Sequence, residues 1–276
     1  MEKFISAGGC ALRISDSGAP RHPEEQDPEG ATAVLLHGYL ESLNVWEDFS
    51  KLLSPHIRVI AIDLPGHGIS EVKGEAHTME FLADTVRSVL EALGVTKCTL
   101  IGHSMGGYAA LEFLRKYPEM LTGLILLHSH PNPDSEEKRR DREREIAVVA
   151  AGKKDLLANT VARGFAPENR ARFHAAIDEL KDQVFLTEDE GIAALLRGMA
   201  QRGDTNQTLS QSAVPHMFIF GRKDEYIAPE AAEQIIKLHP EATVAWLENS
   251  GHMGFVEQPR EAAEAILSFC RGLRRE

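Results

Sequence analysis

The chain has 276 residues, of which 43% are hydrophobic and 26% charged, a composition typical of a globular protein with a full core. Its formal net charge of −12 argues against nucleic acid or an anionic membrane surface as a partner. No apolar run approaches the ~20 residues that a membrane helix requires, and the first residues lack the apolar stretch of a secretory signal. The three cysteines lie far apart, without metal-ligand spacing. We therefore expect a cytoplasmic protein.

Short apolar strands alternate with helices along much of the chain. Residues 3–15 predict an opening hairpin, and the proline-rich, charged segment 19–30 predicts a mobile surface loop. Further strands are expected near residues 32–37, 57–62, 97–102, 122–127, 214–220 and 243–248. Helices are expected at 108–117 and from about 260 to 273. Alternation at this spacing predicts a mostly parallel sheet with helices on both faces.

The alternation stops between residues 128 and 212, where no strong strand pattern occurs. Helices are expected there at 135–151, 153–164, 167–182 and 188–201. The first of them starts with charges of both signs, which is typical of a solvated helix face rather than a nucleic-acid patch. An insertion at this place would lie over the strand ends as a lid. We therefore predict a core of residues 1–129 and 211–276 and a helical cap of residues 130–210.

The segment Gly102-His103-Ser104-Met105-Gly106-Gly107 follows an expected strand and opens an expected helix. A serine with glycine at both ±2 positions in such a turn is typical of a nucleophile elbow. The turn is so tight that side chains at the ±2 positions would collide with neighbouring backbone, and the serine takes a strained conformation. The strain exposes the hydroxyl beside a helix N-terminus, whose free N–H groups stabilise negative charge. Ser104 is therefore the candidate nucleophile.

A serine hydroxyl needs a base to remove its proton, and the base needs a buried carboxylate to fix its tautomer. Among the twelve histidines, His252 lies in a glycine-flanked loop after the last expected strand. Asp224 follows the strand before it and is the best candidate acid, with its neighbour Glu225 as the main competitor. Three strand-end positions in this order predict a catalytic triad of Ser104, Asp224 and His252.

Together these motifs resemble the α/β-hydrolase fold superfamily, and within it the group of small esterases, lactonases and cofactor-free haloperoxidase-like enzymes. The matching segments are His37-Gly38-Tyr39, Asp63 to Ser70, Gly102 to Gly107, Gly221 to Asp224, and Ser250 to His252. The resemblance implies an α/β-hydrolase fold, with a mostly parallel central sheet, helices on both faces and a helical cap inserted after the sixth strand. Ser104 separates the chain from haloalkane dehalogenases and from epoxide hydrolases of this fold, which use aspartate at the elbow.

The resemblance also implies an oxyanion hole made of two backbone N–H groups. One belongs to the residue after the nucleophile, Met105, and the other to the loop after the third strand, at Tyr39. His37 in that loop is expected to brace the backbone by hydrogen bonds. The turn from Asp63 to Ser70 is expected to be structural, so His67 is not counted as catalytic.

Other candidates lie where the expected core meets the expected cap. His128 and His130, at the end of the strand near 122–127, are candidate substrate-binding residues, with plain packing as the alternative. No carboxylate or cysteine at a suitable spacing supports a metal beside them, and we expect neither a metal nor a cofactor. The inner face of the cap is expected to meet the substrate through some of its apolar residues, namely Phe165, Phe173, Phe185 and Leu195.

These residues predict a hydrolase that cleaves a carboxylic ester, lactone or thioester of a small molecule through an acyl-serine intermediate. Carbon–carbon bond hydrolysis, perhydrolysis or lyase chemistry on the same triad is the alternative, because one fold hosts several reactions. A ligand receptor that keeps the triad and turns over slowly is a third interpretation. The sequence leaves the identity of the substrate and the oligomeric state open.

Overall fold

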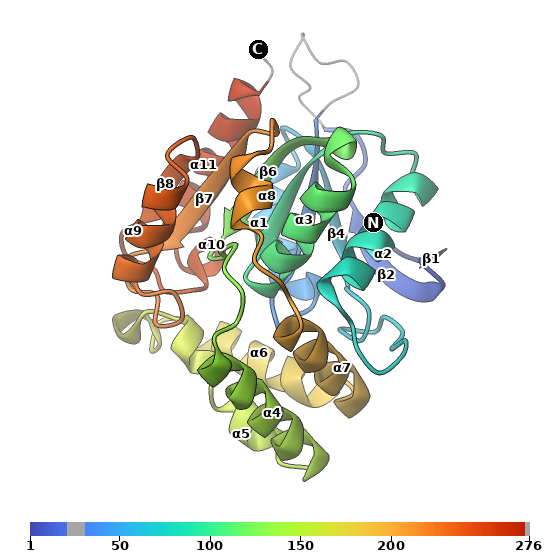
Figure 1. Cartoon of the computed structure of the whole chain (residues 1–276), viewed down its shortest axis with the longest axis vertical. Coiled ribbons are helices and arrows are strands. Elements are labelled where there is room, and N and C mark those ends of the chain that lie inside the picture. The colour runs from blue at the N-terminus through green and yellow to red at the C-terminus, as the bar shows by residue number, and fades with distance from the viewer. Residues whose placement is uncertain (21–30, 274–276) are drawn as a thin grey trace.

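The computed structural model describes residues 1–20 and 31–273, so most of the expected loop at 19–30 lies outside the described residues. The centre of the molecule is an eight-stranded sheet with the strand order β1-β2-β4-β3-β5-β6-β7-β8 (Figure 1). The strands are β1 (Glu2–Ala7), β2 (Cys10–Asp16), β3 (Thr32–Leu36), β4 (Arg58–Ile62), β5 (Cys98–His103), β6 (Leu121–Leu127), β7 (His216–Gly221) and β8 (Thr243–Leu247). Both pairings of β2 are antiparallel and the others are parallel, which confirms the expected hairpin and the mostly parallel sheet.

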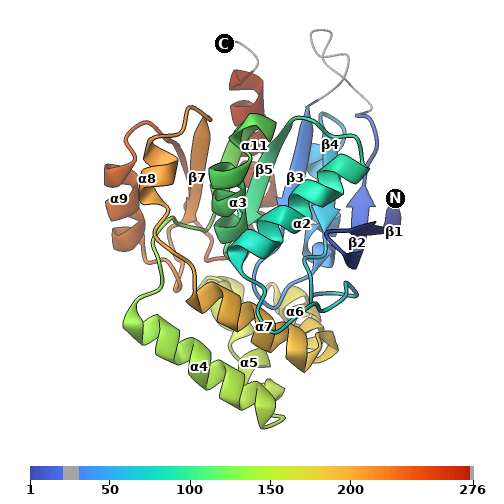
Figure 2. The same ribbon diagram turned by 45° about the vertical axis from the view of Figure 1, so that its right-hand side comes forward.

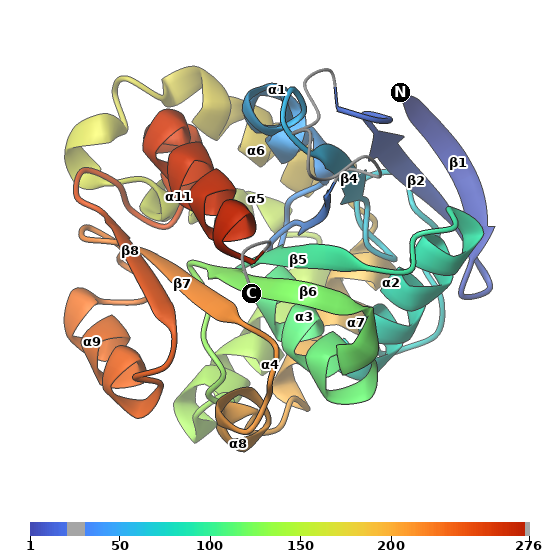
Figure 3. The same ribbon diagram turned by 90° about the horizontal axis from the view of Figure 1, so that it is seen from above.

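Helices cover both faces of this sheet, as the view in Figure 3 shows. One face carries α1 (Glu47–Leu53) and α11 (Pro259–Gly272), and the other carries α2 (Met79–Ala92), α3 (Met105–Lys116) and α9 (Pro229–Leu238). Successive residues of a strand point to opposite faces, so β3 contributes Val34 to one buried apolar cluster and Leu35 to the other. Burial on both faces explains why the parallel strands are almost continuously apolar. No helix among the described residues is long and apolar enough to cross a membrane.

Five α-helices lie between β6 and β7 in the chain, and the first four are α4 (Glu136–Ala150), α5 (Lys154–Ala158), α6 (His174–Leu186) and α7 (Asp189–Ala200). Figures 1 and 2 show them grouped together at one end of the molecule, on the side to which the chain leaves β6. The helix expected at 167–182 begins later, at His174, because Pro167 starts a separate short 3-10 helix over Pro167–Asn169. The short helix α8 (Asn206–Ser210) lies apart from the four, in contact with α3.

α7 packs directly against the backbone of a loop that follows β4. The N–H group of His77 donates a 2.9 Å hydrogen bond to the carbonyl oxygen of Ala194 on α7. A Cβ atom at Gly198 would collide with the carbonyl group of His77, and one at Gly191 would collide with the backbone of Gly66. Two glycines on one side of α7 therefore allow the helix to approach the loop more closely than any side chain permits.

We predict that Gly198→Ala destabilises the protein, although alanine alone favours a helix by about 1 kcal/mol over glycine. The collision involves backbone that cannot move aside, so the net loss should be about 2 kcal/mol, or roughly 4 °C in melting temperature. Gly203→Ala is the control, because a Cβ atom there meets nothing within 4 Å. Equal melting temperatures for the two variants would show that α7 can shift away from the loop.

Candidate active site

Ser104 lies at the tight turn between β5 and α3. Its φ of 49° falls in the left-handed region that favours glycine, and it immediately precedes the first residue of α3. A Cβ atom at Gly102 would collide with the backbone of Gly106, and one at Gly106 would collide with the carbonyl group of Leu36. The side chains on both sides of Ser104 are fully buried, whereas Ser104 itself is half-buried. The turn thus has the strained geometry and the glycine contacts expected from the sequence.

His252 and Asp224 meet across the loops that follow β8 and β7. The Nδ1 atom of His252 donates a 2.8 Å hydrogen bond to Oδ2 of Asp224. Oδ1 of Asp224 accepts the N–H groups of Tyr226 at 2.7 Å and Ile227 at 3.0 Å. Burial by itself would raise the pKa of Asp224, but the charge and the hydrogen bond of His252, together with the nearby ring of His128, hold that pKa far below its usual range. Asp224 is therefore an ionised acceptor that leaves Nε2 of His252 available as a base.

Glu225, the competing acid, points elsewhere. Its carboxylate contacts Arg170 at 2.5 Å and Arg163 at 3.4 Å, in a partly exposed cluster on the surface. Of the two neighbouring acids, only Asp224 is hydrogen-bonded to the ring of His252.

The two expected oxyanion donors lie at adjacent strand ends. Tyr39 follows β3 and Met105 follows β5, and these strands are hydrogen-bonded neighbours in the sheet. Among the described residues, neither of their backbone N–H groups donates a hydrogen bond to another residue. His37 braces the loop as expected, because its Nε2 atom accepts the N–H group of Leu64 at 3.1 Å.

His128 contacts the candidate acid and is fully buried at the end of β6. Its Nε2 atom accepts the N–H group of Gly254 at 3.2 Å, so the proton of the neutral ring is on Nδ1, which lies 3.5 Å from Oδ2 of Asp224. Burial lowers the pKa of His128 to about 4 despite the nearby carboxylate. His128 is thus a neutral second imidazole facing Asp224, a role that the sequence did not suggest.

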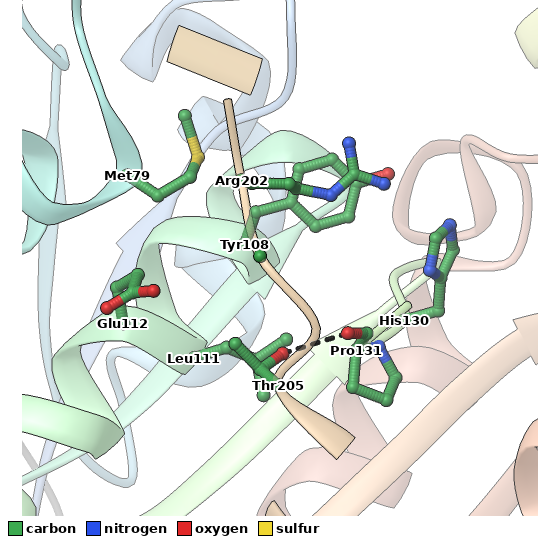
Figure 4. Close-up of a pocket in the computed structure, with 9 residues that line it drawn as sticks. Met79, Tyr108, Leu111, Glu112, His130, Pro131, Arg202 and Thr205 are labelled. Atoms are coloured by element: carbon green, nitrogen blue, oxygen red, sulfur yellow. Dashed lines mark hydrogen bonds between the residues drawn. The ribbon is translucent and has the colours of Figure 1, made fainter. Parts of the chain in front are cut away.

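His130 and Phe165 lie at different depths. His130 is half-buried, and its ring lies 5.5 Å from that of Tyr108, beside the small pocket in Figure 4 that Arg202 also lines. Burial and the charge of Arg202 lower the pKa of His130 to about 4. Phe165 is fully buried and packs against Phe173. Contact of His128, His130 or Phe165 with a substrate stays a prediction.

A buried ion pair connects three loops of this site. Nδ1 of His103 donates to Oε2 of Glu41 at 3.0 Å, and Nε2 of His103 donates to the carbonyl oxygen of His252 at 3.0 Å. The same Oε2 atom accepts the N–H group of Gly38 at 2.6 Å. With Glu41 ionised, both ring nitrogens of His103 face acceptors, an arrangement that favours the charged imidazolium. Neither residue was found from the sequence, since only the folded sheet brings the loops together.

The two charges of this pair stabilise each other electrostatically. Burial would lower the pKa of His103, but the charge and hydrogen bond of Glu41 outweigh burial and raise that pKa above its ordinary value of 6.5. Burial would likewise raise the pKa of Glu41, whereas the charge and hydrogen bond of His103 lower it below its ordinary value of 4.5.

A second buried ionic cluster holds the two ends of the four-helix insertion. The carboxylate of Asp134, before α4, binds the guanidinium groups of Arg142 on α4 and Arg202 after α7. The guanidinium of Arg202 also lies 3.8 Å from the ring centre of Tyr108, four residues beyond Ser104. Arg142 belongs to the charge run that we expected to be solvated. Its 5% exposure corrects that expectation for this one residue, because Asp134 offers it a buried partner.

The family follows from this fold and from the sequence. A sequence model described as "Alpha/beta hydrolase family" matches residues 33–265, and the chain belongs to this family of enzymes. The expected fold and the resemblance drawn from the motifs are both confirmed.

Particular relatives are similar over most of their length. The chain is 30% identical over 283 residues to the dihydrolipoyllysine-residue acetyltransferase component of the acetoin cleaving system of Pseudomonas putida, covering 98% of this chain and 73% of that protein. It is 29% identical over 254 residues to a pimeloyl-[acyl-carrier protein] methyl ester esterase of Aeromonas hydrophila, covering 89% of this chain and 97% of that protein. A thermophilic esterase from Thermogutta terrifontis superposes with a TM-score of 0.88 at 29% identity, covering 99% of both chains. The enol-lactonase from Burkholderia xenovorans LB400 superposes with a TM-score of 0.86 at 20% identity, covering 98% of this chain and 100% of that one. At this identity the similarity shows the fold alone.

We predict that Glu41→Gln removes a pH-dependent part of the stability. The raised pKa of His103 contributes stability that is complete below pH 6.5 and is lost as pH rises through the folded-state value. The lowered pKa of Glu41 contributes stability above pH 4.5 that is lost in acid. Between pH 4.5 and pH 6.5 the substitution should lower the free energy of unfolding by about 2–3 kcal/mol. The loss should be smaller at alkaline pH, where His103 of the parent has lost its charge.

Urea unfolding of both proteins from pH 5 to pH 9 measures this difference. Glu119→Gln, which changes an exposed acid, is the control and should differ little from the parent at any pH. A stability difference for Glu41→Gln that stays constant over this pH range would contradict a charged His103.

Proposed function

We propose that this chain is a serine hydrolase that cleaves a carboxylic ester, lactone or thioester of a small molecule through an acyl-serine intermediate. The observation that carries the proposal is the 2.8 Å hydrogen bond from His252 to Asp224. The backbone of His252 is hydrogen-bonded to His103, the residue before the strained Ser104. The similarity to esterases of Aeromonas hydrophila and Thermogutta terrifontis supports the same reaction class.

In the proposed mechanism, Oγ of Ser104 attacks the carbonyl carbon while Nε2 of His252 takes its proton. The carboxylate of Asp224 keeps the other ring proton on Nδ1 and stabilises the imidazolium that forms. The N–H groups of Met105 and Tyr39 then stabilise the tetrahedral oxyanion, each by about 3–4 kcal/mol. His252 protonates the leaving alcohol or thiol, and afterwards activates the water that releases the acyl group from Ser104.

Residues 130–210 are proposed to cap this site and to set its substrate preference. Segment 160–170 contacts the loops that carry the acid and the base: the carbonyl oxygen of Gly164 accepts the N–H group of Met253, and that of Thr160 accepts the hydroxyl of Tyr226. The Tyr226 ring lies 5.1 Å from that of His252. The insertion is therefore in direct contact with the loops that carry the proposed acid and base, which is where a substrate pocket is required.

We predict that Ser104→Ala lowers kcat/KM for p-nitrophenyl acetate at least about 10³-fold, because no other group can form the acyl-enzyme. The melting temperature should stay within a few degrees of the parent. Intact-protein mass spectrometry of chain quenched during turnover should find one acyl group on the parent and none on Ser104→Ala. Ser210→Ala, at an exposed serine, is the control. Near-parental turnover by Ser104→Ala would exclude it as the nucleophile.

The assignment of the acid gives a separate prediction. Asp224→Asn should lower kcat by about 10⁴-fold, because an amide holds the wrong tautomer of the base. Glu225→Gln should change kcat only a few-fold, since that carboxylate pairs with surface arginines. Steady-state kinetics of the two variants with one short-chain ester compare them directly, and the reverse ranking would transfer the role to Glu225.

A further inference from the structure

Two histidines and a glutamate meet at the end of the sheet opposite Ser104. His216 is the first residue of β7, His239 follows α9, and Glu241 lies in the turn before β8. One ligand atom from each, namely Nε2 of His216, Nδ1 of His239 and a carboxylate oxygen of Glu241, lies within 4.8 Å of the other two. Asp224 follows the far end of β7, about 17 Å away by the rise of the strand. This cluster is therefore separate from the proposed catalytic residues.

Hydrogen bonds fix which nitrogen of each ring is free. Nδ1 of His216 lies 3.3 Å from the carbonyl oxygen of Val214, which can only accept, so the proton of the neutral ring is on Nδ1 and the lone pair on Nε2. Nε2 of His239 lies 3.0 Å from Oδ1 of Asn206. The amide nitrogen of Asn206 is 2.7 Å from the carboxylate of Asp204, which settles the orientation of the amide. His239 therefore donates from Nε2 and holds its lone pair on Nδ1.

The two free nitrogens point at the carboxylate of Glu241, and neither carries a hydrogen to donate to it. Nε2 of His216 lies 3.4 Å from Oε1 of Glu241, and Nδ1 of His239 lies 3.5 Å from the same oxygen. Both nitrogens are buried and have no hydrogen-bond partner in the described part of the chain, although the residues are only 4% and 1% exposed. A single proton could serve only one of them. A cation between the three atoms would satisfy all of them at once.

The spacing also matches a metal site. Ligands at about 2.0–2.1 Å from a tetrahedral Zn²⁺ lie about 3.4 Å from one another. The two measured separations from Glu241 fit that edge length. The outer nitrogen of each imidazole donates to an oxygen, which is the usual support of a metal-ligating histidine. The side chain of Glu241 is 42% exposed, so an ion can enter from solvent and keep a water as its fourth ligand.

We propose that His216, His239 and Glu241 form a divalent-cation site, with Zn²⁺ as the ion that it prefers. Two imidazoles and one carboxylate favour zinc over magnesium or calcium, which prefer oxygen ligands alone. The ion would join the start of β7, the end of α9 and the turn into β8. Its role is to stabilise this part of the fold, without taking part in the reaction at Ser104. This proposal departs from the expectation of no metal that was drawn from the sequence.

Titration of the full-length, chelator-stripped protein with ZnCl₂ at pH 7.5 tests the proposal. Calorimetry should find tight binding at one ion per chain, and saturating Zn²⁺ should raise the melting temperature by about 5 °C. Glu241→Gln should weaken binding at least tenfold while leaving the fold intact, because this side chain is partly exposed and the amide has the same shape. Glu230→Gln is the matched control, since it removes an exposed acid at the start of α9 and should bind as the parent does.

Two results would overturn the proposal. One is unchanged Zn²⁺ affinity in both Glu241→Gln and His239→Gln, which would place the ion elsewhere. The other is loss of turnover of p-nitrophenyl acetate at the first equivalent of Zn²⁺. That loss would place the ion at His128, Asp224 and His252, the other cluster among residues 1–20 and 31–273 that is close enough to share an ion. Unchanged turnover by the parent at one equivalent supports the site away from Ser104. If the protein proves inactive on esters, the calorimetry and the melting temperatures still decide the question.

Discussion

The buried ion pair of Glu41 and His103 is the interaction on which the geometry of the site depends. Parallel strands bring their carboxyl ends to one edge, but each end continues into a separate loop with its own freedom. Glu41 holds the backbone of Gly38, and His103 holds the carbonyl group of His252, so one pair of charges fixes three loops. A shift of about 1 Å in such a constellation can cost about 10²-fold in rate, which is why a rigid connection matters.

Strain accompanies this connection. Three non-glycine residues in the described part of the chain have positive φ, namely Leu40, Ser104 and His128, and they follow β3, β5 and β6. Such conformations cost of order 1–3 kcal/mol each and persist where surrounding contacts over-determine them. The contacts here are the ion pair, the hydrogen bond from Ser129 to the carbonyl oxygen of Ser104 and the one from Gly254 to His128. These contacts hold the three residues in their strained backbone conformations.

The sequence predicted the parts of the molecule that local patterns encode. Strand limits and the position of Ser104 follow from apolar runs and glycine spacing, and both agree with the structure. Asp224 could be ranked above Glu225 only by its place after a strand, whereas the structure separates them by their partners. Glu41 has no local signature because its partner is 62 residues away in the chain. Arg142 has none because it lies within a run of mixed charges, eight residues from its partner. Pairing of buried charges is decided by the tertiary fold.

The four-helix insertion is joined to the core at a few fixed points. Asp134 clamps the start of α4 and the segment after α7 together, beside the ring of Tyr108 on the elbow helix. The two glycines of α7 fix a third point against the loop after β4. Between these points, the exposed side chains of α4 to α6 can vary without disturbing the contacts that hold the insertion to the core. This tolerance is a physical reason why one scaffold can host different substrates.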